Sequence, residues 1–362
     1  MLQDNVNYRI PFEQNNKSYM FGMSGLFIFF LLSILFAVCI GTVNIQPEKA
    51  YQIILYKLFH LSFGDNLKQI PLTHFDIIWQ IRFPRVLMAV IVGVGLALCG
   101  TVMQSSVQNP LADPYILGIS AGASLGATLS ILLSSYGIFS EFGTSFWAFA
   151  GALAASFLVM ILSGIGGKSS AVKMILSGII ANALFSAFTS FIIYMANNAE
   201  GIRTVTFWTM GSLASAKWSN LTLPAIGVVG CTLFFLSQAR NLNTMLLGEE
   251  AATTLGVDLI KLRRNNIIVT ALLTGLIVAS CGIIGFVGLI IPHIVRGFVG
   301  SDHRKLLPAA ILSGALFLTW ADVLARTALS SGELPIGIIT ALIGAPFLMH
   351  IMIKSAFGFG DK

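Results

Sequence analysis

Residues 86–107 read VLMAVIVGVGLALCGTVMQSSV, an apolar stretch without a single charged side chain. A helix that crosses the hydrocarbon core of a bilayer needs about 20 residues of this kind. Eight further stretches predict spanning helices: Phe21–Val43, Ile116–Leu133, Phe146–Gly164, Met174–Ala196, Leu221–Leu236, Ile267–Ile284, Leu307–Ala325 and Ile336–Ile353. A tenth, Gly288–Val299, is too short to cross with ease, so we expect a half-length helix buried among the others. The pattern predicts an all-α polytopic membrane protein.

The composition of the whole chain indicates the same class. Of its 362 residues, 56% are hydrophobic and 10% are charged, whereas a soluble domain carries about 25% charged residues. Too few charges remain to cover a water-facing surface. The formal net charge of +6 fits the lysines and arginines that collect in the cytosolic loops of membrane proteins. We therefore expect the lipid bilayer, and no nucleic acid, as a partner.

The distribution of positive charge predicts the orientation. With the N-terminus inside, the cytosolic segments hold more Lys and Arg than the outer segments, as the positive-inside rule requires. We expect a polar cytosolic N-terminus at residues 1–20, a single transmembrane domain at residues 21–356 and a cytosolic tail at residues 357–362. Within that domain, residues 240–266 form a cytosolic loop with a short helix that stops near Gly256. The polar start of the chain does not read as a cleavable signal peptide.

Motifs for catalysis and metal binding are missing from the sequence. It contains no HExxH or GxSxG pattern, and each of its four cysteines sits alone in an apolar stretch. The string Gly-Lys-Ser at residues 167–169 lacks the glycine that a Walker motif needs at the position of Leu162. We therefore expect a transport subunit rather than an enzyme, with no catalytic residue, no metal site and no cofactor bound by this chain.

Charged residues inside or beside the spans are the main functional signal. Asp322 is the only acidic residue inside an apolar span, and Arg326 follows one helical turn later, where the two side chains can pair. Arg82 and Arg85 precede the second span on the outer side. Two interpretations stay open for these three arginines. They receive carboxylates from a soluble partner, or they pair internally or extend to lipid headgroups.

Several motifs occur in one order along the chain. They are RFPRVLMAVIVGVGLALCGTVMQSSVQNPLADPYILGISAGASLGA (82–127), LLGEEAATTLGV (246–257), GFVGLIIPHIVRGFVGSDHRKLLPAA (285–310), ADVLART (321–327) and ELPIGIITALIGAPFLM (333–349). In these blocks the chain resembles the FecCD-type permease subunits of bacterial binding-protein-dependent ABC importers for iron-siderophores, haem and cobalamin. The resemblance runs from about Ile81 to Ile353, and the first eighty residues match less well.

The resemblance implies an architecture and a set of partners. We expect the type II ABC importer fold, with about ten transmembrane helices per subunit, in the bacterial cytoplasmic membrane. A second copy of the chain, or a similar permease subunit, would complete the pathway. Two ABC ATPase subunits would use ATP and Mg, and a soluble or lipid-anchored binding protein would deliver the substrate.

The resemblance also implies roles for particular residues. Arg82, Arg85 and Arg326 look like the arginines that receive glutamates from the binding protein. The segment Leu247–Asp258 looks like the helices that contact the ATPase, with these candidate contacts: Leu247, Gly248, Glu249, Ala251, Leu255 and Gly256. Gln104, Asn109 and Pro110 fall in the turn assigned to the inner end of the pathway.

The expected function is the ATP-driven import of an iron chelate by alternating access. A ferric siderophore is our first choice, followed by haem and cobalamin, because ferric siderophores are the commonest substrates of the family that the chain resembles. The alternative is an ion-coupled secondary transporter. Such a carrier usually has carboxylates near the middle of the membrane, and their absence from the sequence argues against it.

Overall fold

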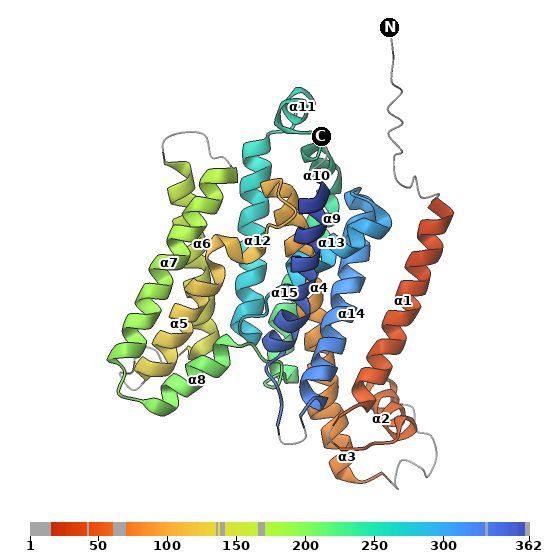
Figure 1. Cartoon of the computed structure of the whole chain (residues 1–362). Helices are drawn as coiled ribbons and strands as arrows, with labels where there is room; N and C mark the ends of the chain where they lie inside the picture. Colours follow the sequence, from red (N-terminus) through yellow and green to blue (C-terminus); the bar gives the residue numbers. More distant parts are fainter. Residues whose placement is uncertain are drawn as a thin grey trace.

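A computed structural model describes residues 16–41, 43–60, 70–134, 137, 142–165, 171–329 and 332–358. Most of the expected polar N-terminus and of the C-terminal tail therefore lies outside the described residues. Throughout the described part of the chain the regular structure is helical (Figure 1). This agrees with the all-α class that the sequence predicts.

Within the described residues, seven helices are long and apolar enough to cross a membrane, and three shorter apolar stretches of helix accompany them. The long ones are α1 (Asn16–Cys39), α4 (Phe83–Val107, preceded by α3, Leu72–Asp76, and the π-helix η2, Ile77–Arg82), α6 (Gly143–Gly164), α7 (Ala171–Met195), α9 (Trp218–Ser237), α12 (Leu259–Cys281) and α14 (His303–Thr327). The shorter ones are α5 (Ile119–Leu133), α13 (Val287–Val299) and the stretch Ile336–Ile351 of α15, a helix that runs over Ile336–Gly358. All ten predicted segments are helical, and the prediction of about ten membrane helices is confirmed.

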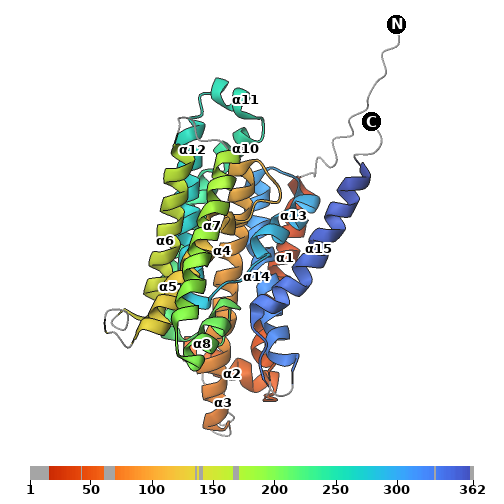
Figure 2. The same ribbon diagram turned by 60° about the vertical axis from the view of Figure 1, so that its left-hand side comes forward.

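Helix α4 lies at the centre of the bundle, where α9, α12, α13 and α14 pack around it (Figures 1 and 2). Its glycines allow two of these neighbours to approach closely. A Cβ atom at Gly93 would overlap the carbonyl group of Gly314 in α14, and one at Gly100 would overlap that of Gly288 in α13. Close backbone approach at small residues is the usual basis of helix packing in membranes. The half-length helix α13 is thereby held deep in the bundle, as the sequence predicts.

A second group of helices, α5, α6 and α7, packs on the other side of α12 (Figure 1). Gly122 and Gly126 of α5 lie against the backbone of α6 at Gly151 and Trp147. The row of small residues at spacing four in α5 therefore serves helix packing.

Four short helices lie at the ends of the bundle, and of these the sequence analysis predicted α11, the short helix before Gly256. One end carries α2 (Pro47–Phe59) and α8 (Ala199–Thr209), and the opposite end carries α10 (Ala239–Met245) and α11 (Glu249–Thr254) (Figures 1 and 2). We refer to them below as the α2/α8 end and the α10/α11 end.

Candidate functional site

The three arginines singled out in the sequence come together at the α2/α8 end. Arg82 belongs to η2, Arg85 to the first turn of α4 and Arg326 to the last turn of α14. All three are buried, with exposed fractions of 4–5%. Arg82 donates to the carbonyl oxygen of Cys39 at 2.7 Å, and Arg326 to that of Ala37 at 2.6 Å. Both guanidiniums thus satisfy the carbonyls at the C-terminal end of α1, where a cation is favourable.

Two carboxylates complete this arginine cluster. Arg85 Nε donates to Asp322 Oδ1 at 2.8 Å, and Arg85 Nη1 donates to Glu333 Oε2 at 2.7 Å. Arg326 Nε lies 3.5 Å from the other oxygen of Asp322. Asp322 is fully buried, whereas the Glu333 side chain is 43% exposed. The two guanidiniums neutralise the charge of the buried carboxylate. Without such partners, burying a charged group would cost several kcal/mol of free energy.

In the structure the three arginines therefore pair with groups of the same chain. This is one of the two interpretations that the sequence left open. Contact with the carboxylates of a soluble partner stays a prediction. The half-exposed Glu333 is the carboxylate that such a partner would have to displace from Arg85.

At the opposite end of the molecule, a cavity of about 420 Å³ lies beside the last turn of α4. It is lined by Gln104, Asn109 and Pro110, together with Gly248 and Arg296. Gln104 joins α4 to α13 at two points, because its amide nitrogen donates to the carbonyl of Leu289 at 3.2 Å and its Oε1 accepts from Arg296 Nη2 at 2.9 Å. The structure thus brings the three predicted pathway residues into one cavity. Their role in transport stays a prediction.

A hydrogen-bonded chain that the sequence analysis missed connects this cavity to α10. Ser105 Oγ of α4 lies 2.6 Å from His303 Nε2, and His303 Nδ1 lies 2.8 Å from Asn243 Oδ1 of α10. Since the amide oxygen can only accept, we assign the proton to Nδ1, so Ser105 donates to Nε2. Gln108 adds a bond from its amide nitrogen to the carbonyl of Met245, at 2.8 Å. These bonds join α10 to the end of α4.

The segment Leu247–Asp258 extends beyond the end of the bundle, with α11 at its tip (Figures 1 and 2). Gly248 and Gly256 flank α11 with φ values of 94° and 81°, a region that favours glycine. Leu247 and Leu255 are 63% and 64% exposed, and Ala251 between them is half-buried. The backbone of Glu249 opens α11, and its side chain lies outside the described residues. Two apolar side chains are thus presented at the tip of the molecule.

The end of this segment is fixed to α12. Asp258 Oδ1 accepts a hydrogen bond from the backbone N–H of Lys261 at 3.0 Å and caps the helix. This bond, with help from the Lys261 ammonium group, holds the pKa of Asp258 below its usual value. The C-terminal end of the exposed segment is therefore held at the N-terminus of α12.

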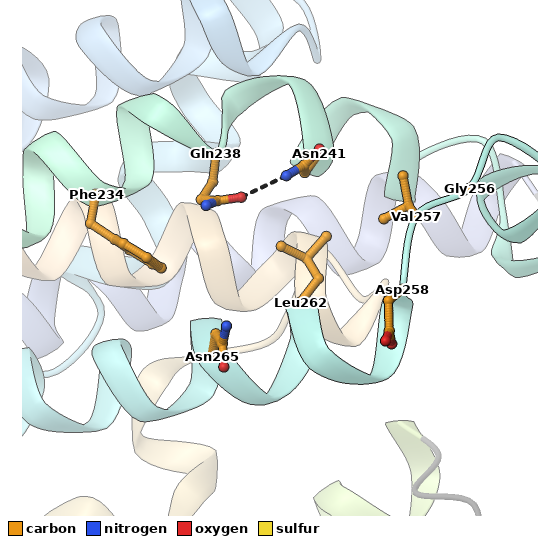
Figure 3. Close-up of a pocket in the computed structure, with 8 residues that line it drawn as sticks. All are labelled: Phe234, Gln238, Asn241, Gly256, Val257, Asp258, Leu262 and Asn265. Carbon is orange, nitrogen blue, oxygen red and sulfur yellow. Dashed lines mark hydrogen bonds between the residues drawn. The ribbon is translucent and has the colours of Figure 1, made fainter.

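A small pocket of about 300 Å³, with both polar and apolar walls, lies beside the same segment, between the end of α9, the first turn of α10 and the start of α12 (Figure 3). Gln238 and Asn241 line one side and are joined by a 2.7 Å hydrogen bond, while Val257 and Asp258 line the other. The segment thus has open space beside it at this end.

Comparisons with known proteins show the family of the chain. The model of the FecCD transport family matches residues 28–354. The chain is 38% identical to the hemin transport system permease protein of Yersinia pestis, over 91% of this chain and 96% of that protein. It is 42% identical to the cobalamin import system permease protein of Halobacterium salinarum, over 81% of this chain and 76% of that protein.

A solved structure is also similar. It is described as an inward-facing conformation of a metal-chelate type ABC transporter, and it superposes with a TM-score of 0.79 at 33% identity. The match covers 93% of this chain and all of that one.

Proposed function

The chain belongs to the FecCD transport family, and we propose from this premise that it passes an iron chelate through the membrane by ATP-driven alternating access. It is a multi-pass membrane protein and an ABC importer permease, a transport subunit. In the proposal, both termini and the α10/α11 end face the cytosol, and the α2/α8 end faces outward.

One observation carries the proposed mechanism, namely the exposed tip beside the inner cavity. Leu247 and Leu255 present apolar surface at the place where a separate subunit would dock. Gly248 belongs both to this segment and to the cavity lining, next to Gln104. A displacement of the docked tip would therefore change the cavity directly.

The proposed cycle uses these parts in order. A loaded binding protein docks at the α2/α8 end, where charge pairing sets register and encounter rate. Two ATPase subunits, which hold ATP and Mg, close on ATP and move the docked segment Leu247–Asp258. The bonds from Asn243 to His303 and from Gln108 to Met245 carry this movement to α4 and α14. The bundle then exposes its cavity to the other side as a two-state element.

The substrate class is the finer part of the proposal. Relatives named for hemin and cobalamin, and a structural neighbour described as metal-chelate type, share a metal held in an organic ligand. A ferric siderophore is our first choice, with haem and cobalamin next. The pathway is completed by a second copy of the chain or by a similar permease subunit.

Co-purification tests the assembly. We would isolate the tagged protein from its native membranes in mild detergent and identify its partners by mass spectrometry. An ABC ATPase, with a solute-binding protein, is the expected result. The ion-coupled alternative would be indicated by a stable preparation that never carries an ATPase. In that case the protein, reconstituted into proteoliposomes with an ion gradient, should transport until an uncoupler is added.

Uptake into proteoliposomes tests the substrate. The complete complex would be supplied with its binding protein loaded with a ⁵⁵Fe-labelled siderophore, with hemin or with cobalamin, with and without ATP. ATP-dependent accumulation of the iron siderophore supports the first choice. Accumulation of cobalamin alone would contradict the iron chelate while leaving the importer mechanism intact.

A further inference from the structure

The cavity beside the last turn of α4 has a positive charge in its wall. Of the described residues that line it, Arg296 in the last turn of α13 alone is charged. Within the described part of the chain, the guanidinium makes one hydrogen bond, from Nη2 to the neutral amide oxygen of Gln104, and no ion pair. The carboxylate of Asp302, close by in the sequence, instead accepts from Asn243 and from the backbone N–H of Arg304. The charge of Arg296 is therefore not compensated by the described residues.

Asn109 adds a second hydrogen-bond donor to the same wall. Its Oδ1 accepts from the backbone N–H of Leu111 at 2.9 Å, which fixes the orientation of the amide and leaves Nδ2 as its free end. Among the residues that the structure describes, neither this Nδ2 group nor the Ser301 hydroxyl has a hydrogen-bond partner, and neither side chain is buried. A guanidinium, an amide nitrogen and a hydroxyl, each able to donate further bonds, thus line one open cavity.

The size and the remaining walls of the cavity favour a small organic molecule as its occupant. A volume of about 420 Å³ exceeds that of a single side chain from a partner subunit and lies in the usual range of small-molecule sites. Apolar surface from Pro110, Met245 and Leu246 lies beside the donors. The planar fork of an arginine matches a carboxylate in both charge and geometry. The cavity therefore fits an organic anion, with its carboxylate at Arg296 and its carbon skeleton against the apolar wall.

We propose that Arg296 and Asn109 bind a carboxylate of the cargo as it leaves the pathway, so that the transported chelate is an organic anion. This inference rests on the proposed import function and narrows its substrate class. It favours ferric siderophores with free carboxylates, and hemin with its two propionates, over cationic chelates and over cobalamin, which has no carboxylate. A single cation on an open wall holds such an anion weakly, which suits a site that must release its ligand.

Labelling of Ser301→Cys in the purified full-length protein tests the charge of the cavity without transport. The rates of reaction with an anionic sulfonatoethyl and a cationic trimethylammonioethyl methanethiosulfonate are compared by mass spectrometry of the peptide that carries residue 301. We expect Arg296→Gln to lower the ratio of the anionic to the cationic rate roughly tenfold. One unit charge a few ångströms away changes the local concentration of each reagent about threefold in water, in opposite directions.

Arg240→Gln is the matched control, because it removes an exposed cation of α10 at the same end of the molecule. It should leave the ratio of rates nearly unchanged, and Arg296→Lys should preserve the ratio of the wild type. A ratio that does not respond to Arg296→Gln, or that falls equally in Arg240→Gln, overturns the proposal.

Protection of the same cysteine tests binding of the anion itself. Ferric citrate, an anionic carboxylate chelate, should slow the reaction of Ser301→Cys with uncharged methyl methanethiosulfonate. Ferrioxamine B, a cationic ferric chelate, should not slow it at the same concentration. Arg296→Gln should remove the protection by ferric citrate. Equal protection by the two chelates, or none by either, overturns the proposal.

Uptake by the complete complex tests the cargo. ATP-dependent uptake of an anionic chelate should fall roughly fivefold in Arg296→Gln, and Arg296→Lys should restore most of it. Accumulation of a cationic or uncharged chelate, at a rate that Arg296→Gln leaves unchanged, would overturn this inference and leave the importer function intact. If no chelate accumulates, the proposed function fails, and the two labelling experiments still decide whether the cavity binds anions.

Discussion

At the scale of single residues, Asp322 is the group on which the arginine cluster depends. It is fully buried and shared by Arg85 and Arg326. Asp322→Asn would leave both guanidiniums buried without their common counter-ion, and we expect a loss of about 3–5 kcal/mol of stability. Thermal unfolding in detergent measures the loss.

Glu333→Gln is the matched control, because Glu333 contacts the same Arg85 but is half-exposed. A pair screened by water in this way contributes less than about 1 kcal/mol. Equal destabilisation by Asp322→Asn and Glu333→Gln would show that Asp322 is not the main counter-ion of the two buried arginines.

Asp113, in the turn after α4, makes stability depend on pH. Burial raises the pKa of this carboxyl group to about 6, partly offset by the hydrogen bond from the Tyr115 backbone N–H. Because the pKa is raised in the folded state, the protonated form is favoured. The folded protein loses stability as the pH rises from about 4 to about 6 and the group ionises.

Asp113→Asn keeps the acceptor for Tyr115 and removes this ionisation. We expect the variant to unfold at a higher temperature than the wild type above about pH 6, with the difference vanishing near pH 4. Melting curves at several pH values measure it. A difference that stays constant with pH would contradict a raised pKa.

At the scale of elements, the contact between α4 and α13 depends on the absence of a side chain. A Cβ atom at Gly100 would overlap the backbone of Gly288. We expect Gly100→Ala to cost about 1–3 kcal/mol, because overpacking forces the helices apart. Gly230→Ala, at an open position of α9, should be neutral or slightly stabilising. Thermal unfolding compares the two, and similar melting temperatures would show that α4 and α13 do not cross this closely.

The sequence predicted the ten apolar helices because each carries an apolar run with at most one charged side chain, and an isolated segment in lipid satisfies its backbone polar groups only as a helix. It missed α2 and α8, which are short and contain charged residues such as Glu48 and Glu200. It also missed the chain from Ser105 through His303 to Asn243. These residues are 198 and 60 positions apart, so no local spacing indicates their contact.

The site residues also differ in whether the local sequence could predict their surroundings. Gln104, Asn109 and Pro110 belong to one turn, and the structure places them in one cavity. For Arg82, Arg85 and Arg326 the sequence could not choose between internal and external partners. The choice depends on Glu333 and on the last carbonyls of α1, which only the folded chain brings near.

At the scale of the whole molecule, the proposed function requires the ATPase to dock on Leu247 and Leu255 and to move the segment that carries them. Replacing both with Asp places charge where an apolar contact is proposed, without touching the described core. We expect ATP-dependent uptake to fall at least tenfold, the equivalent of about 1.4 kcal/mol at the interface. The ATPase should be lost from the purified complex.

Leu255→Met keeps the apolar surface and should retain both transport and the ATPase. Normal uptake by the double Asp variant would show that this tip is not the docking surface. An unaltered melting temperature of the isolated permease is the check that the fold is intact.

The arginine cluster also has a consequence for how the chain is made. Arg85 enters the ribosomal exit tunnel 237 residues ahead of Asp322, its buried counter-ion. A nascent chain must therefore keep this guanidinium in water or among headgroups until α14, which carries Asp322, has been translated. The start of α4 can take its final place only after α14 has entered the membrane, so the pairing of these two helices orders the assembly of the bundle.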